Sequence, residues 1–241
     1  INLQINNKQY KHQKNSNYMN LIKGTREQAE LNAALTITSS LKNILSKKRL
    51  CVLAVPGGTS VSSIFDHLVA QDLPWDRIHL FLVDERLVSL KHKDSNSHVL
   101  KPFYKVMNEE NIHLFNYKLK KKDKGITDYR SELKKLGGRI DFALLSSGED
   151  GCVGALYHAH PSIYSNAAYF LLMDDSPKPP KKRMSMSPLL LMQAKAGMVI
   201  FFGESKRTAY ERFNDRYKTV RDCPAKIVLS MKEHYVVTDL Q

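Results

Sequence analysis

Apolar positions in residues 26–48 recur every three or four residues, which is typical of a long amphipathic helix. The period changes at residues 50–55, a continuous apolar run of strand length that ends at Pro56-Gly57-Gly58. A second stretch compatible with a helix, residues 59–70, follows at once. This order predicts a strand, a tight glycine turn and a helix.

The same alternation continues to the end of the chain. It predicts strands at 78–83, 140–145, 167–173, 198–202 and 235–239, and helices at 95–107, 127–136, 188–195 and 204–217. Strands that are apolar on both faces and alternate with helices indicate an α/β fold, with a doubly wound, mostly parallel sheet of the Rossmann-like type. We expect a single domain over residues 21–241, preceded by a ragged polar lead-in at residues 1–20.

The composition is that of an ordinary globular chain: 241 residues, 42% hydrophobic and 25% charged. A disordered tail and a collagenous rod are excluded. The apolar runs are far shorter than the roughly 18 residues that cross a bilayer, so we expect a soluble, cytoplasmic protein with no membrane partner. The cysteines Cys51, Cys152 and Cys223 form no C-x-x-C pair and are odd in number, which favours a reducing compartment.

The net charge of +13 makes nucleic acids, anionic membranes and phosphorylated metabolites candidate partners. The basic residues gather in short runs at 47–49, 118–124 and 178–183 with no shared period, which is typical of solvated loops and helix ends. Zinc-finger spacing, a basic region with heptads and an RNA-binding aromatic signature are all missing from the sequence. We therefore expect no nucleic-acid partner.

The ligand of an open α/β sheet binds outside the carboxyl ends of its strands. The turn formed by Gly57, Gly58, Thr59 and Ser60 lies where the first strand leads into a helix. Free backbone N–H groups, the helix dipole and two hydroxyls there suit a phosphate. The alternative is a tight turn with Thr59 or Ser60 as helix N-cap. The turn is not a Walker loop, because no Gly-Lys-Ser/Thr follows.

Asp84-Glu85-Arg86 places two carboxylates and a guanidinium after a buried strand, which is more charge than a turn needs. The alternative is a surface ion pair with a helix cap. Asp94-Ser95-Asn96 has the composition of a helix cap that also lies over the site.

A third candidate segment, Gly148-Glu149-Asp150-Gly151-Cys152, follows another strand. Its glycines permit a close backbone approach to a ligand, and a turn alone explains the glycines but not the acidic pair. Arg183 and Lys206 each adjoin a predicted strand or helix and are candidates for binding a phosphate. Taken singly, each is more often a solvated cation.

Taken together and in this order, these segments resemble the 6-phosphogluconolactonase family, whose fold is shared with glucosamine-6-phosphate deaminases. The resemblance runs from about residue 54 to residue 225. It rests on Gly57-Gly58-Thr59-Ser60, on Trp75 and His79 before Val83-Asp84-Glu85-Arg86, on Asp94-Ser95-Asn96, on Lys178-Pro179-Pro180 with Arg183, on Gly203-Glu204-Ser205-Lys206 and on Pro224-Ala225.

The chain departs from the family in its strongest motif, and the residues that follow, 153–158, are altered but in register. The family motif Gly-x-Asp-Gly-His ends in the histidine associated with proton transfer, and here the histidine is Cys152. An imidazole titrates at a pH of about 6.5 and a thiol at about 8.5, so a thiol at neutral pH chiefly donates a proton. Three outcomes are open: a slower reaction carried by Asp84, proton transfer by Cys152 or by His158 or His160, or a binding domain without catalysis.

The resemblance implies hydrolysis of 6-phospho-glucono-1,5-lactone in the oxidative pentose phosphate pathway, with no metal and no organic cofactor. Its phosphate sites would be Gly57, Gly58, Thr59, Ser60, Arg183 and Lys206, and its catalytic sites Asp84, Arg86, Asp150, Cys152 and His158. The partners implied are the phosphorylated sugar lactone and a fused or associated glucose-6-phosphate dehydrogenase. A non-catalytic sugar-phosphate-binding or assembly domain is the main alternative, and a glucosamine-6-phosphate deaminase is less favoured.

Overall fold

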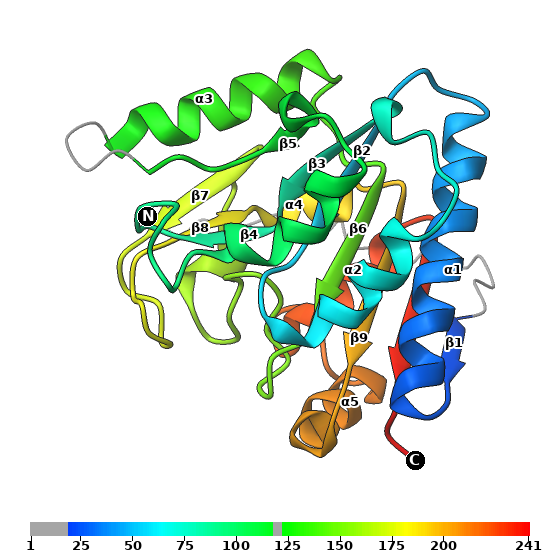
Figure 1. Cartoon of the computed structure of the whole chain (residues 1–241). Coiled ribbons are helices and arrows are strands. Elements are labelled where there is room, and N and C mark those ends of the chain that lie inside the picture. Colours follow the sequence, from blue (N-terminus) through cyan, green and yellow to red (C-terminus); the bar gives the residue numbers. More distant parts are fainter. Residues whose placement is uncertain (1–18, 118–121) are drawn as a thin grey trace.

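A computed structural model describes residues 19–117 and 122–241 and contains a seven-stranded sheet (Figure 1). In spatial order the strands are β1 (Asn20–Lys23), β10 (Glu233–Thr238), β9 (Ala196–Phe201), β6 (Phe142–Ser146), β2 (Cys51–Val55), β3 (Ile78–Leu82) and β5 (Ile112–His113). Every neighbouring pair is parallel. The predicted doubly wound parallel sheet is therefore confirmed.

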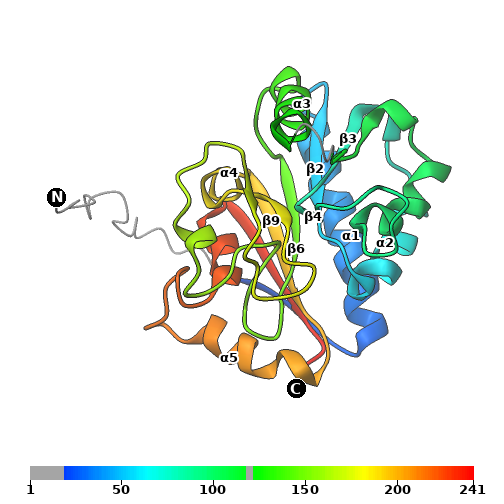
Figure 2. The same cartoon turned by 90° about the vertical axis from the view of Figure 1, so that its left-hand side faces the viewer.

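Helices cover both faces of this sheet (Figure 2). The α-helices are α1 (Arg26–Leu45), α2 (Ser62–Val69), α3 (Lys122–Lys135), α4 (Pro188–Met192) and α5 (Arg207–Asn214). The 3-10 helices are η2 (Thr59–Val61), η3 (Trp75–Arg77), η4 (Asn96–Lys105), η5 (Glu109–Asn111), η6 (Pro161–Tyr164), η7 (Glu204–Lys206) and η8 (Pro224–Ser230). Residues of α1, α2 and η4 pack on one face, and residues of α3, α4, α5 and η8 pack on the other.

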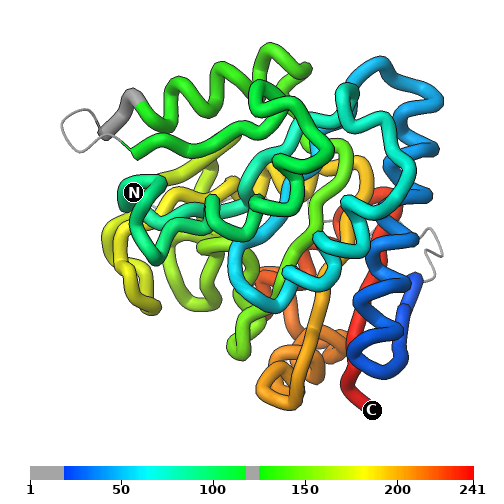
Figure 3. The backbone as a smooth tube through the Cα atoms, in the orientation of Figure 1, coloured from blue at the N-terminus to red at the C-terminus, as the bar shows by residue number. Residues whose placement is uncertain are grey.

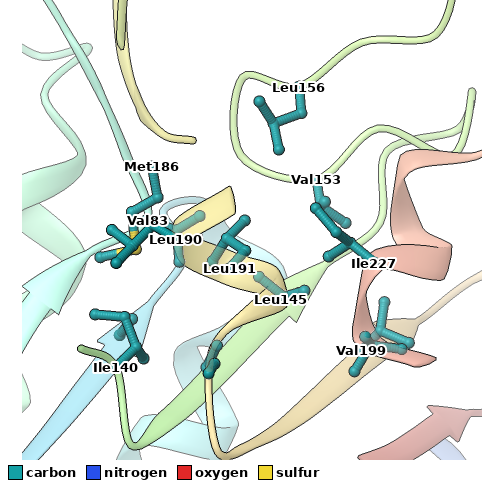
Figure 4. Close-up of a cluster of buried hydrophobic side chains, with 14 of the residues drawn as sticks. Val83, Ile140, Leu145, Val153, Leu156, Met186, Leu190, Leu191, Val199 and Ile227 are labelled. Atoms are coloured by element: carbon teal, nitrogen blue, oxygen red, sulfur yellow. The ribbon is translucent and has the colours of Figure 1, made fainter. Parts of the chain in front are cut away.

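Alternate residues of each strand enter opposite cores, as expected for a sheet buried on both sides. Leu145 of β6 and Val199 of β9 pack with Leu190 of α4 and Ile227 of η8 (Figure 4). The neighbouring Leu144 enters the core under α1 and α2. Removing one buried leucine from such a core costs about 2–5 kcal/mol.

A second, antiparallel sheet stands beside the carboxyl ends of the main sheet. It consists of β4 (Asp84–Arg86), β8 (Arg183–Met186) and β7 (Phe170–Met173). The strand predicted at 167–173 therefore exists from Phe170 but belongs to this sheet. The pairing of β4 with β8 brings Asp84 and Arg183 into the same short ladder.

Several boundaries differ from the predictions for local reasons. The helix expected at 95–107 is the 3-10 helix η4, which contains Pro102, because proline cannot donate the hydrogen bond that an α-helix needs there. The predicted lead-in at 1–20 lies outside the described residues except at its end, where Asn20 already begins β1. The basic run at 118–124 also lies largely outside them. In the described part of the chain, no helix is long and apolar enough to span a membrane.

Three loops of the candidate site follow parallel strands of the main sheet, namely β2, β6 and β9. In Figure 3 the chain turns at the lower side of the molecule after β6 and after β9. Since β2 and β3 run parallel to these strands, their carboxyl ends lie at the same edge of the sheet. We call this edge the carboxyl rim.

Candidate active site

The glycine turn after β2 needs glycine at both positions. A Cβ at Gly57 would lie 2.0 Å from the side chain of Asn96, and Gly58 has φ +93°, a left-handed conformation that favours glycine. Gly58 is the N-cap residue of η2 and no side chain caps it, so neither Thr59 nor Ser60 is the N-cap. The exposed Thr59 hydroxyl and the backbone N–H groups at the start of η2 are available to an anion.

The Arg26 side chain, which is partly exposed, links this turn to the loop after β9. The Arg26 guanidinium donates to the carbonyl of Ser60 at 3.1 Å and lies 3.7 Å from Asp239 Oδ2. The other oxygen of Asp239 accepts the N–H of Gly203 at 2.8 Å. Lys206 ends the 3-10 helix that starts after Gly203, so its loop is anchored beside the glycine turn. Two predicted phosphate-binding segments are therefore linked through Arg26 and Asp239.

Asp84 and Arg183 form a buried ion pair at the rim. Arg183 Nη1 lies 3.6 Å from Asp84 Oδ2, and the two side chains are 6% and 10% exposed. Arg183 also donates to the carbonyls of Pro180 and Pro179, at 2.8 and 2.9 Å. Burial raises the pKa of Asp84, and the opposing effects of Arg183, Arg86 and Asn96 do not cancel it. A carboxylate in this setting can accept a proton.

Asn96 connects the ion pair to the glycine turn. Its amide donates to the backbone carbonyl of Asp84 at 2.9 Å, while its side chain fills the space beside Gly57. The side chain of Glu85 points elsewhere and accepts the N–H groups of Asn96 and Ser97, at 2.7 and 3.1 Å. Glu85 therefore caps η4. The alternative interpretation of Asp84-Glu85-Arg86 included such a helix cap.

Arg86 holds the neighbouring loop. Its Nη1 donates to the carbonyl of Asp94 at 2.7 Å. Its buried Nε has no hydrogen-bond partner among the described residues. Ser95 is the N-cap of η4 and accepts the N–H of Ser97, which confirms the predicted cap at 94–96.

Asp150, Cys152 and Lys178 form a second polar group at the rim. The Lys178 ammonium donates to Asp150 Oδ1 at 2.9 Å and to Cys152 Sγ at 3.2 Å. Asp150 also accepts the N–H of Cys152 at 3.2 Å. Gly148 is required here, because a Cβ on it would lie 2.3 Å from the Cys152 sulfur.

The charges of this group follow from its contacts. Burial, followed by the proximity of Asp150, raises the pKa of Cys152 to about 12, so the thiol is protonated at neutral pH. Burial acts to raise the pKa of Asp150 too, but hydrogen bonds from Cys152 and Lys178 outweigh it and lower that pKa. The pair of Asp150 and Lys178 is therefore ionised beside a neutral thiol.

Tyr157 packs beside the Lys178 group, since the centre of its ring lies 5.9 Å from Lys178 Nζ. Burial raises the pKa of its phenol, and the hydrogen bond with Ser176 does not cancel this effect. The loop before Tyr157 packs against β4, since a Cβ on Gly154 would lie 3.6 Å from Asp84 Cβ. The ion pair and the Lys178 group thus face the same part of the rim.

The histidines after Cys152 have other surroundings. His158 is exposed, and it lies near Asp222, whose pKa is lowered first by hydrogen bonds from Thr219 and less strongly by His158. His160 contacts Ser162 and lies 3.2 Å from Asp175. Over residues 19–117 and 122–241, no hydrogen bond or ion pair joins either histidine to Cys152, so a catalytic role for His158 has no support from these contacts.

Comparisons with known proteins agree with this geometry. The family model described as glucosamine-6-phosphate isomerases/6-phosphogluconolactonase matches residues 24–237. A 6-phosphogluconolactonase of Borreliella burgdorferi is 31% identical over 197 residues, which is 79% of this chain and 83% of that protein.

The chain belongs to the glucosamine-6-phosphate isomerase/6-phosphogluconolactonase family.

Further relatives extend this assignment. The GDH/6PGL endoplasmic bifunctional protein of Homo sapiens is 32% identical over 168 residues, and the match spans 64% of this chain but only 21% of that protein. The crystal structure of a 6-phosphogluconolactonase from Thermotoga maritima superposes with a TM-score of 0.78 at 21% identity, covering 92% of this chain and 99% of that one. The second comparison shows that the fold is shared.

Five residues of the rim that contribute to its geometry were not among the predicted site residues: Arg26, Asn96, Tyr157, Lys178 and Asp239. Asn96 and Lys178 carried a signal, since both lie in segments that resemble family motifs. Arg26 and Asp239 carried none, because it is the pairing of β1 with β10 that brings the segments just before Arg26 and Asp239 together.

Proposed function

We propose that this chain hydrolyses 6-phospho-glucono-1,5-lactone to 6-phosphogluconate. The observation that carries the proposal is the buried Asp84–Arg183 pair, which the Asn96 side chain connects directly to the glycine turn. A proton-accepting carboxylate thus stands beside a turn suited to a phosphate. The net charge of +13 favours a substrate that carries a negative phosphate.

The residues divide the task between the two ends of the substrate. The backbone of Gly57 and Gly58, the hydroxyls of Thr59 and Ser60 and the Lys206 ammonium bind the phosphate. Arg183 has N–H groups left beyond those that hold the proline carbonyls, and its contact to the phosphate stays part of the proposal.

At the lactone end, Asp84 accepts a proton from the attacking water. Arg183 holds its carboxylate in place, and the raised pKa makes this carboxylate a stronger base than an exposed aspartate. Arg86 and Asp150 orient the surrounding loops through their contacts to Asp94 and Lys178. The Cys152 thiol is protonated and contributes no base at neutral pH.

Direct measurement of lactone loss tests the proposal. The purified chain is mixed with freshly made 6-phosphogluconolactone, and the disappearance of the lactone is followed and corrected for spontaneous opening in buffer. We expect a rate well above the buffer rate and a preference for this lactone over unphosphorylated gluconolactone. A rate equal to the buffer rate contradicts the enzymatic proposal and favours a non-catalytic sugar-phosphate-binding domain, for which Cys152 is the motivating observation.

The family description also includes glucosamine-6-phosphate isomerases, so the same preparation is incubated with glucosamine 6-phosphate. Ammonia release with no lactone hydrolysis would assign the chain to the deaminase reaction. We also propose that a glucose-6-phosphate dehydrogenase, fused or associated, supplies the lactone, since the matched bifunctional relative carries the similar region within a longer chain. Sequencing the full-length transcript tests the fusion.

We further propose a reducing, cytoplasmic location, because all three cysteines are free and buried. Imaging of a fluorescent fusion of the full-length protein tests this, and a signal confined to a secretory compartment would contradict it.

A further inference from the structure

The Lys178 ammonium is fixed at the rim while part of it stays open to solvent. Its side chain is 43% exposed, yet two side-chain contacts hold its Nζ, one to Asp150 and one to Cys152. The Nζ also lies 5.9 Å from the centre of the Tyr157 ring. A lysine on a free surface has no such set of partners, and its amine moves through many rotamers.

The backbone of Lys178 is fixed as well. The buried Ser176 hydroxyl donates to the carbonyl of Lys178 at 2.9 Å and accepts its N–H at 3.2 Å. The same hydroxyl contacts the Tyr157 phenol at 2.9 Å. Arg183, which pairs with Asp84, donates to the carbonyl of Pro179, the residue after Lys178, so the position of the ammonium is set relative to the Asp84 carboxylate.

The two groups have opposite capacities for proton transfer. Burial raises the pKa of Asp84 and so makes it a better proton acceptor. Burial acts to lower the pKa of Lys178, but its contacts with Cys152 and Asp150 outweigh this effect and raise the pKa. Lys178 therefore remains a cation and a hydrogen-bond donor at neutral pH. Asp84 is therefore a candidate proton acceptor and Lys178 a permanent cationic N–H donor, the two roles that attack of water on a carbonyl group needs.

We propose that Lys178 is a catalytic residue that stabilises the negative charge on the lactone carbonyl oxygen, and that Asp150 and Cys152 position its ammonium. This inference rests on the proposed lactone hydrolysis. Cys152, which stands where the family motif has histidine, is then a neutral positioning residue, and the cationic donor at this part of the rim is the lysine.

The reaction balances with these two groups. The water oxygen forms a bond to the carbonyl carbon and gives its proton to Asp84, while the carbonyl electron pair moves onto the oxygen facing Lys178. When that pair returns, the bond from the carbonyl carbon to the ring oxygen breaks, and the ring oxygen takes the proton from Asp84. The product is the open acid, which ionises in solvent, and Lys178 keeps its proton throughout.

The experiment compares Lys178→Met with Lys181→Met, which removes a charge from an exposed position of the same loop. We expect Lys178→Met to lower kcat by about 10²–10³-fold, the usual effect of removing one donor to a developing oxyanion. KM should change little, since the phosphate contacts remain. Lys181→Met should keep the wild-type kcat, and Lys178→Arg should retain part of it.

Chemical rescue separates charge stabilisation from a structural role. Ethylammonium added to Lys178→Ala should raise kcat with increasing concentration, because it returns a cationic N–H donor to the vacated position. Tetramethylammonium, which has the charge but no N–H, should not. If Lys178→Met loses kcat but ethylammonium does not raise the kcat of Lys178→Ala, the assignment of Lys178 as a catalytic residue is overturned.

The outcomes also separate this inference from the proposed function. A wild-type chain no faster than buffer contradicts lactone hydrolysis itself. A fast wild type together with an equally fast Lys178→Met contradicts only the role of Lys178.

Discussion

Replacing Asp84 by asparagine removes the proposed base and keeps its shape. With an effective dielectric constant of about 20, charges at the 3.6 Å separation of Asp84 and Arg183 attract by about 5 kcal/mol. Burial costs several kcal/mol per ion, so the two terms are of similar size. The raised pKa of Asp84 shows that burial wins, which leaves the carboxylate able to accept a proton.

An asparagine at this position cannot accept that proton. We expect Asp84→Asn to lower kcat by about 10²–10⁴-fold, which corresponds to about 3–5 kcal/mol of activation free energy. Stability should fall by only about 1–3 kcal/mol, because Arg183 keeps its bonds to the carbonyls of Pro179 and Pro180. Asp66→Asn, at an exposed position of α2, is the matched control and should change neither quantity.

The pH dependence gives a second check on Asp84. Since its folded pKa is raised, the wild-type rate should fall as the pH falls through that pKa, while the residual rate of Asp84→Asn should lack this step. The folded pKa of Asp84 also lies above its unfolded pKa. The contribution of this carboxyl group to the stability of the fold is therefore complete below the unfolded pKa and is lost as the pH rises through the folded pKa. The wild type should therefore gain stability relative to Asp84→Asn on acidification, as measured by urea unfolding.

The assay for Asp84→Asn is the corrected rate of lactone loss over a range of pH. A variant rate within about threefold of the wild type at neutral pH would refute the reasoning, because the carboxylate would then have no part in the proton transfer. A lost rate accompanied by loss of the folded state, seen by circular dichroism, would likewise assign Asp84 a structural role only.

Three other changes test separate parts of the rim. Gly57→Ala places a Cβ 2.0 Å from the side chain of Asn96, so we expect lower activity and a stability loss of about 1–3 kcal/mol in urea unfolding. Gly58→Ala meets open space and should cost about 1 kcal/mol of stability through its positive φ. Equal losses of activity in the two variants would contradict this account. Lys206→Met should raise KM for the phosphorylated lactone by about 10–100-fold and leave KM for unphosphorylated gluconolactone unchanged, and an equal rise for both would remove Lys206 from the phosphate site. Cys152, with a pKa of about 12, should react with iodoacetamide at pH 8 only after unfolding, and rapid labelling of the native chain in peptide mass spectrometry would show a reactive thiolate instead.

The main sheet was predictable because its central strands are buried on both faces. Residues 50–55 and 198–202 are continuous apolar runs, and such runs cannot be placed on a surface. The edge strands β1 and β5 are too short for a periodic signal. The strand β4 is Asp84-Glu85-Arg86. Three charged residues in a row indicate a loop, and it is the pairing with β8 that makes this segment a strand.

The candidate site was predictable where one segment carries its own geometry, as in the glycine turn. It was not predictable where a side chain depends on a distant partner. Arg183 was predicted as a phosphate ligand from its charge and place in the chain, but its contacts with Asp84 and the proline carbonyls depend on partners that the sequence does not place beside it. Lys178 lies beside Cys152 only because the loop between β7 and β8 returns over the rim.

A crystal structure with bound 6-phosphogluconate tests the central claim most directly. We predict the phosphate within hydrogen-bonding distance of the backbone N–H groups after Gly57 and of the Lys206 ammonium, with the carboxylate end between Asp84 and Lys178. A ligand bound away from the carboxyl rim, for example in the cavity of about 450 Å³ lined by His79 and His113, with the glycine turn empty, would contradict the account.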